Sequence, residues 1–115
     1  MTVTIYHNAR CSNSRGALEL IRAAGIEPVI IDYVAHPPSR AALQALITAA
    51  GLSVREAMRT KDGLFAELGL DDPALGEAAL LDALAAHPCL LNRPFVCTPK
   101  GTRLCRPPEL AMALF

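Results

Sequence analysis

The order of elements at the start of the chain constrains its fold most strongly. Residues 3–6 are rich in β-branched side chains and predict a short strand, and residues 29–33 form a near-continuous apolar run that predicts another. Between them apolar residues recur at helical spacing, with Ser12 or Ser14 available as the N-cap and Gly25 at the C-terminal end. This order predicts a right-handed βαβ unit whose second strand lies in a parallel sheet covered on both faces.

The rest of the chain predicts a helical block, a hairpin and a last helix. Residues 39–87 show no strand signal, and helical segments are expected at 39–51, 53–58, 64–68 and 77–86. Residues 95–97 and 102–104 predict a hairpin with Gly101 at its tight turn, followed by a helix that begins at Pro107 and Pro108. We therefore expect one α/β domain over residues 1–115: a βαβ half, a helical insertion at about 39–87, and a ββα half.

Composition narrows the class of protein. Hydrophobic residues make up 52% of the 115 residues and charged residues 19%, an ordinary globular balance. The net charge is zero, which leaves no electrostatic footprint for nucleic acid or an anionic membrane surface. The N-terminus shows no secretory signal pattern, and no apolar run approaches the ~20 residues that span a bilayer. We expect a soluble cytoplasmic protein.

The four cysteines are expected to be thiols in such a reducing compartment. No C-x2-C or C-x4-C pair occurs, so the sequence predicts no metal site. Cys89, Cys97 and Cys105 are expected to pack in the core or on strands. The alternative that one of them serves as a resolving thiol for Cys11 stays open.

Cys11 is placed differently, where the first strand passes into the first helix. Backbone N–H groups at a helix start can lower the pKa of a thiol and bind an oxyanion. Position 14 is serine, so this is a single thiol with a hydroxyl one helical turn away and not a C-x-x-C dithiol. As an imidazolium, His7 would further favour the thiolate, although a strand-end histidine bonded to the backbone is an equally open interpretation.

Nine arginines against two lysines suit local binding of an oxyanion, because a guanidinium presents a fixed fork of donors. Arg59 follows a short predicted helix, whereas Arg93 and Arg106 each precede a proline. A residue before proline favours extended backbone, which can present a side chain from a fixed loop. Spacing alone leaves open whether these three arginines meet at Cys11.

Several segments together resemble the glutaredoxin-coupled arsenate reductase family, in the family's order and over nearly the full length. They are His7-Asn8-x-x-Cys11-Ser12-x-Ser14-Arg15, Arg59, Asn92-Arg93-Pro94 and the run from Thr102 to Glu109. The resemblance implies a thioredoxin-like mixed sheet with a helical insertion. It implies Cys11 as the nucleophile and a cis peptide bond before Pro94. It also implies supporting residues: Arg59, Arg93 and Arg106 around the oxyanion, His7 and Ser14 tuning the thiolate, and Arg15 as a secondary contact.

The resemblance further implies reduction of arsenate to arsenite. In the family's scheme the cysteine forms a thioester with arsenate, glutathione adds to the arsenic, glutaredoxin removes glutathione as a mixed disulfide, and arsenite is released. Glutathione is then a co-substrate and glutaredoxin a partner, and no metal or bound organic cofactor is expected. Two alternatives stay open: a monothiol glutathione-dependent oxidoreductase, and a thioredoxin-like regulatory module that binds RNA polymerase. Ser14 argues against the regulatory module, because that module senses oxidants through C-x-x-C.

Overall fold

The computed structural model describes residues 2–115, and the chain divides into two compact units. The first unit joins the residues up to His36 with Arg93–Phe115. The second unit is Pro37–Asn92, which contains the helical insertion expected at about residues 39–87. No helix of residues 2–115 is long and apolar enough to cross a membrane.

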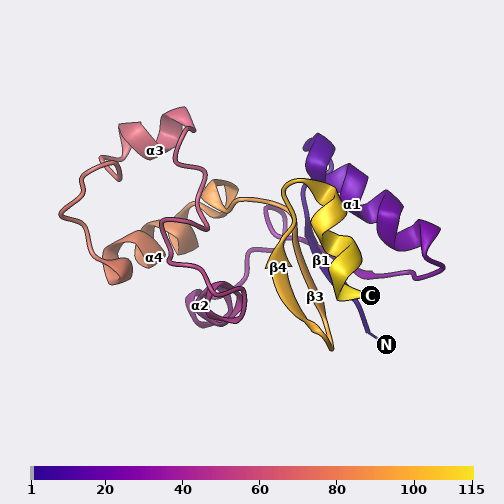
Figure 1. Ribbon diagram of the computed structural model, residues 1–115. Helices are drawn as coiled ribbons and strands as arrows, with labels where there is room; N and C mark the ends of the chain where they lie inside the picture. Colours follow the sequence, from indigo (N-terminus) through magenta and orange to yellow (C-terminus); the bar gives the residue numbers. More distant parts are fainter. Residues whose placement is uncertain (1) are drawn as a thin grey trace. The chain divides into compact units, whose positions relative to one another are not determined.

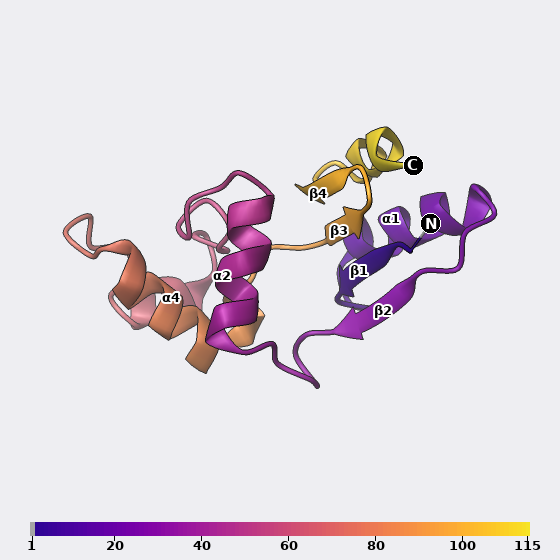
Figure 2. The same ribbon diagram turned by 90° about the horizontal axis from the view of Figure 1, so that it is seen from below.

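A four-stranded mixed sheet forms the centre of the first unit (Figures 1 and 2). Its strands are β1 (Thr4–His7), β2 (Val29–Asp32), β3 (Phe95–Thr98) and β4 (Gly101–Leu104), in the order β2-β1-β3-β4. β1 pairs in parallel with β2 and antiparallel with β3, and β3 pairs antiparallel with β4. The predicted βαβ and ββ segments therefore share one sheet, which confirms the α/β architecture.

Two helical segments pack together against this sheet. They are α1 (Ser12–Ala23) and the short 3₁₀ helix η2 (Pro108–Leu114), which Figure 1 shows side by side. The final helix lies where the sequence predicted it, but it is a 3₁₀ helix and not the expected α-helix. The buried cluster between these elements comprises Val3, Ile5, Ala17, Ile21, Val96, Cys105, Ala111 and Leu114.

The ends of α1 follow the sequence signals in part. Gly25 has a φ of 80°, and its N–H donates to the carbonyl of Arg22 at 3.0 Å, so it ends the helix as predicted. The N-cap, however, is Cys11, with extended backbone and no capping bond from its side chain. The expectation of a Ser12 or Ser14 cap is wrong because both residues lie inside the first helical turn.

The expectation that the second strand is covered on both faces is wrong for β2. It lies at the edge of the sheet, and Val29 and Ile30 are 54% and 41% exposed, so the strand is not covered on both faces. An apolar run indicates a strand but does not encode its place in the sheet, which depends on partners far along the chain.

The hairpin confirms its prediction. Thr98 pairs with Gly101 at the end of the ladder, and Pro99 and Lys100 form the centre of the turn between them. Gly101 has a φ of 148°, a conformation that favours glycine, which explains the turn-like signal at this position.

The second unit holds the helices α2 (Arg40–Ala49), α3 (Gly63–Glu67), α4 (Glu77–Ala86) and the 3₁₀ turn η1 (Pro88–Leu90). Ser39 caps α2 by accepting the N–H of Ala42 at 3.1 Å. The helix predicted at residues 53–58 is wrong. Ser53 and Glu56 form a reciprocal capping pair, but the chain leaves the helical path after one turn and Met58 pairs with Leu91 in an isolated bridge.

Candidate active site

Cys11 is the N-cap residue of α1 and is half-buried. The preceding loop is tight, because the Cys11 N–H donates to the carbonyl of Asn8 at 3.0 Å. Its Sγ accepts hydrogen bonds from the backbone N–H groups of Asn13 and Ser14, which are free at a helix start. The predicted placement of a thiol at a strand-to-helix junction is thus confirmed.

Two guanidinium groups reach the same sulfur from the C-terminal part of the first unit. Nη1 of Arg106 lies 3.7 Å from Sγ of Cys11 and 2.8 Å from the carbonyl oxygen of Arg93. The side chain of Arg93 also donates to Sγ. With the amide of Asn13 turned so that its oxygen faces Arg106, that oxygen accepts from Nη2 at 3.2 Å. Folding therefore assembles a cationic thiol site from two separate segments of the chain.

Both arginines precede a cis peptide bond. The Arg93–Pro94 bond is cis, the geometry expected at this position, and the Arg106–Pro107 bond is also cis, which was not predicted. Pro94 is buried at the start of β3, and Pro107 stands just ahead of η2.

The hydrogen bonds make Cys11 acidic. Burial alone would raise the pKa of the thiol, but the donors outweigh burial and lower the pKa from 9.0 to about 7. The thiolate is therefore substantially populated at neutral pH, unlike that of an ordinary cysteine. The donors are the N–H of Ser14, the side chain of Arg93, the N–H of Asn13 and the side chain of Arg106.

Ser14 acts through its backbone and its position. The residue is fully buried, and its Oγ accepts the N–H of Asn8 at 3.2 Å. Its own N–H donates to Cys11 Sγ. The hydroxyl thus ties the loop before Cys11 to the first turn of α1, and the backbone provides the bond to the sulfur.

The protonation state of His7 bears on whether it favours the Cys11 thiolate. Burial lowers its pKa, and the opposing effect of nearby Asp32 does not restore it. The lowered pKa favours the uncharged imidazole at pH 7, against the imidazolium interpretation that the sequence left open. Its Nδ1 is buried and, within residues 2–115, makes no hydrogen bond, so the backbone-bonded alternative does not hold for this atom either.

The remaining two predicted arginines make other contacts. Arg15 is exposed, and its Nη1 donates to the carbonyl of Ala9 at 2.8 Å, which braces the loop before Cys11. Arg59 belongs to the second unit, where its Nε is 3.7 Å from a carboxylate oxygen of Asp62. Its role at an oxyanion stays a prediction.

Tyr33 is a site residue that the sequence analysis missed. The sequence predicts only that it ends the second strand, yet it is fully buried and hydrogen-bonded to the side chains of Asn8 and Arg93. A phenol at the end of an apolar strand was the available signal, because a buried Tyr hydroxyl needs polar partners.

The packing expectation holds for Cys97 and Cys105 in the first unit but is wrong for Cys89, which is exposed in the 3₁₀ turn η1. Cys105 is fully buried, and burial raises its pKa to about 11. Burial also raises the pKa of Cys97, so both thiols are protonated at neutral pH. Cys89 is exposed and belongs to the second unit.

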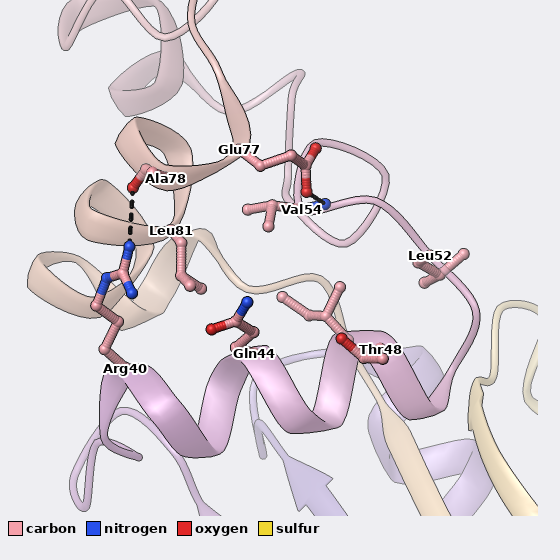
Figure 3. A pocket seen from close by; sticks show the side chains of 9 residues that line it. Arg40, Gln44, Thr48, Leu52, Val54, Glu77, Ala78 and Leu81 are labelled. Carbon is pink, nitrogen blue, oxygen red and sulfur yellow. Dashed lines mark hydrogen bonds between the residues drawn. The ribbon is translucent and has the colours of Figure 1, made fainter.

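A pocket of about 260 Å³ lies within the second unit, between α2 and the start of α4 (Figure 3). Two hydrogen bonds frame it: the Arg40 guanidinium donates to the carbonyl of Ala78, and the Val54 N–H donates to Glu77. No predicted site residue lines it. Among residues 2–115, no group of three or more His, Cys, Asp or Glu could hold a metal ion.

Comparison with known proteins gives consistent matches over most of the chain. The model of the ArsC family matches residues 6–113. An arsenate reductase of Rhizobium meliloti (strain 1021) is 59% identical over 112 residues, which are 97% of this chain and 80% of the relative. An arsenate reductase of Escherichia coli (strain K12) is 46% identical over 112 residues, or 97% of this chain and 79% of the relative.

A solved structure agrees with the fold. That of an arsenate reductase from Vibrio cholerae superposes with a TM-score of 0.96 at 42% identity, and covers 100% of this chain and 98% of its own. The mixed sheet is therefore that of a thioredoxin-like fold.

Proposed function

Because the chain belongs to the ArsC family, we propose that it is an arsenate reductase whose nucleophile is Cys11. One observation supports this proposal most directly: the Cys11 thiol has a pKa of about 7, and two guanidinium groups donate hydrogen bonds to its sulfur. A thiolate and an anionic arsenate repel one another, and fixed positive groups offset that repulsion. The similar proteins named arsenate reductases support the same substrate.

In the first proposed step, the Cys11 thiolate attacks arsenic, a sulfur–arsenic bond forms, and one arsenic–oxygen bond breaks. The departing oxygen leaves as water after protonation, and arsenic stays pentavalent. Arg93 and Arg106 donate to the sulfur, which supports a role for both in binding oxygens of the arsenate that approaches it. Arg59 is proposed as a third cation for this anion.

Glutathione and glutaredoxin are the proposed reductants. The glutathione thiol replaces a second arsenic oxygen, which again leaves as water. A glutaredoxin thiolate then attacks the glutathione sulfur, forms a mixed disulfide, and leaves an electron pair on arsenic, which becomes trivalent. Hydrolysis of the remaining sulfur–arsenic bond releases arsenite and regenerates Cys11. The scheme uses no bound cofactor, and its use of glutathione fits the expected cytoplasmic location.

Reconstitution tests the proposal. Purified protein with arsenate, glutathione and glutaredoxin should form arsenite, and replacement of glutaredoxin by thioredoxin should abolish turnover. Turnover with thioredoxin alone would overturn the proposed reductant but not the substrate. No arsenite with either reductant, together with reduction of protein disulfides, would favour the monothiol oxidoreductase.

Variants test the assigned residues. Cys11→Ser should abolish turnover, because oxygen at this site is not ionised at neutral pH. Arg59→Ala, Arg93→Ala and Arg106→Ala should each lower kcat/KM by about 10²-fold or more, as loss of one preorganised oxyanion donor does. Arg103→Ala is the matched control, since this exposed arginine lies on β4 and should leave turnover unchanged.

A further inference from the structure

We propose that Tyr33 is a positioning residue of the Cys11 site, whose phenolic oxygen accepts hydrogen bonds from Asn8 and Arg93 and so holds Arg93 against the sulfur. The inference rests on the role of Cys11 proposed above. Neither the sequence motifs nor the family resemblance brought Tyr33 into the site.

The fold explains why the phenol is there. Asp32, the last residue of β2, pairs with His7, the last residue of β1. Tyr33 therefore follows β2 at the end of the sheet where β1 also ends and the loop from Asn8 to Cys11 begins. It is fully buried, although β2 is an exposed edge strand. The buried side chain thus reaches Asn8, the first residue of the loop that leads to Cys11.

The hydrogen-bond directions follow from their effect on the phenol. The bond from the Asn8 side chain lowers the pKa of Tyr33, so the amide NH₂ of Asn8 donates to Oη, whereas Oδ1 of Asn8 accepts the N–H of Arg10 at 2.9 Å. A guanidinium can only donate, so Arg93 also donates to the phenolic oxygen. Oη of Tyr33 therefore joins the loop before Cys11 to the loop before β3.

Arg93 is shared between the phenol and the thiol. Its side chain donates to both Tyr33 and Cys11, and its carbonyl oxygen accepts from Arg106. An arginine side chain loses considerable rotamer freedom when it is fixed, so a second anchor favours the geometry that reaches the sulfur. Without Oη, Arg93 keeps its charge but has fewer constraints on where it points.

The phenol stays neutral while Cys11 is charged. Burial raises the pKa of Tyr33, and the nearby Cys11 thiolate raises it further, against the hydrogen bonds that lower it. Tyr33 therefore adds no negative charge that would compete with the thiolate or with an incoming anion for Arg93.

The test is the pKa of Cys11 in Tyr33→Phe, which removes only the hydroxyl. The rate of Cys11 alkylation by iodoacetamide is followed against pH, with the modified peptide quantified by mass spectrometry. We expect the pKa to rise by about half a unit or more, which lowers the alkylation rate at pH 7 by roughly twofold. Tyr6→Phe is the matched control, because Tyr6 is the other tyrosine of the chain and should leave this pKa unchanged.

A double-mutant cycle separates positioning from a general structural effect. In an Arg93→Ala background, Tyr33→Phe should add no further rise, because the group through which Tyr33 acts is gone. Equal rises in both backgrounds, or an unchanged pKa in Tyr33→Phe, would overturn the proposal. Asn8→Ala keeps the phenol and removes the other donor, so it tests the network if Tyr33→Phe proves unstable. A Cys11 pKa that stays unchanged in Asn8→Ala then counts against the network.

These measurements need no arsenate. If the protein fails to reduce arsenate but Tyr33→Phe still raises the pKa of Cys11, the proposed function is wrong and the positioning role stands. If turnover occurs and Tyr33→Phe matches the wild-type pKa profile, the reverse holds.

Discussion

Nη1 of Arg106 lies 3.7 Å from Sγ of Cys11, although the two residues are 95 positions apart in the chain. The same nitrogen lies 2.8 Å from the carbonyl oxygen of Arg93, so one side chain links the thiol to the segment before β3. A cation held in this way stabilises the thiolate more than the thiol, which makes the ionisation of Cys11 a direct report on the folded site.

Arg106→Ala should raise the pKa of Cys11 by about one unit, since it removes a charge-assisted hydrogen bond and a nearby positive charge. Thiolate absorbance at 240 nm, titrated against Cys11→Ser as the blank, measures the shift. Arg103→Ala is the control and should titrate as the wild type does. Equal pKa values in Arg106→Ala and the wild type would mean that Arg106 does not contact the sulfur in solution.

Stability should depend on pH through Cys11. Its folded pKa of about 7 lies below the ordinary value of 9.0, so the folded state favours the thiolate. The resulting stabilisation is complete above about pH 9 and is lost as the pH falls through 7. Thermal unfolding of wild type and Cys11→Ser across this range isolates the effect. The Tm difference should increase from pH 6 to pH 9, and a constant difference would contradict the lowered pKa.

His7→Gln should leave the pKa of Cys11 nearly unchanged at and above pH 7, because burial keeps the imidazole uncharged there. The alkylation profile used above measures this. A rise of about one unit in His7→Gln would show that His7 is an imidazolium and that its pKa is raised instead of lowered.

Gly16→Ala should disturb the site from a distance. An added Cβ at Gly16 would lie 3.1 Å from Cγ of Pro108, which stands two positions after Arg106. We expect crowding of about 1–3 kcal/mol to exceed the gain in helix propensity of about 1 kcal/mol. Tm should therefore fall and the pKa of Cys11 should rise.

Gly63→Ala is the matched control, because an added Cβ there meets nothing within 4 Å. It should leave the pKa of Cys11 unchanged. A Gly16→Ala variant that is as stable as the wild type, with an unaltered Cys11 titration, would show that α1 and η2 can separate at no cost.

Local signals predicted the elements whose causes are local. The α4 helix was predicted with its observed bounds at residues 77–86, and Gly25 was identified as the end of α1 because its φ of 80° favours glycine. The helix predicted at residues 53–58 is wrong, because its signal was local and the cause of its ending is not. A capping pair starts a helical turn there, but the bridge between Met58 and Leu91 takes the chain out of the helical path.

The sequence by itself determined that Cys11 begins a helix, because the strand, the polar loop and the helical pattern around it are all within a few residues of each other. Only the tertiary structure decided which cations reach the sulfur, that His7 is neutral, and that Tyr33 belongs to the site. Each of these depends on burial or on contacts between distant segments, and the pKa of a group is set by its surroundings in space and not by its neighbours in the chain.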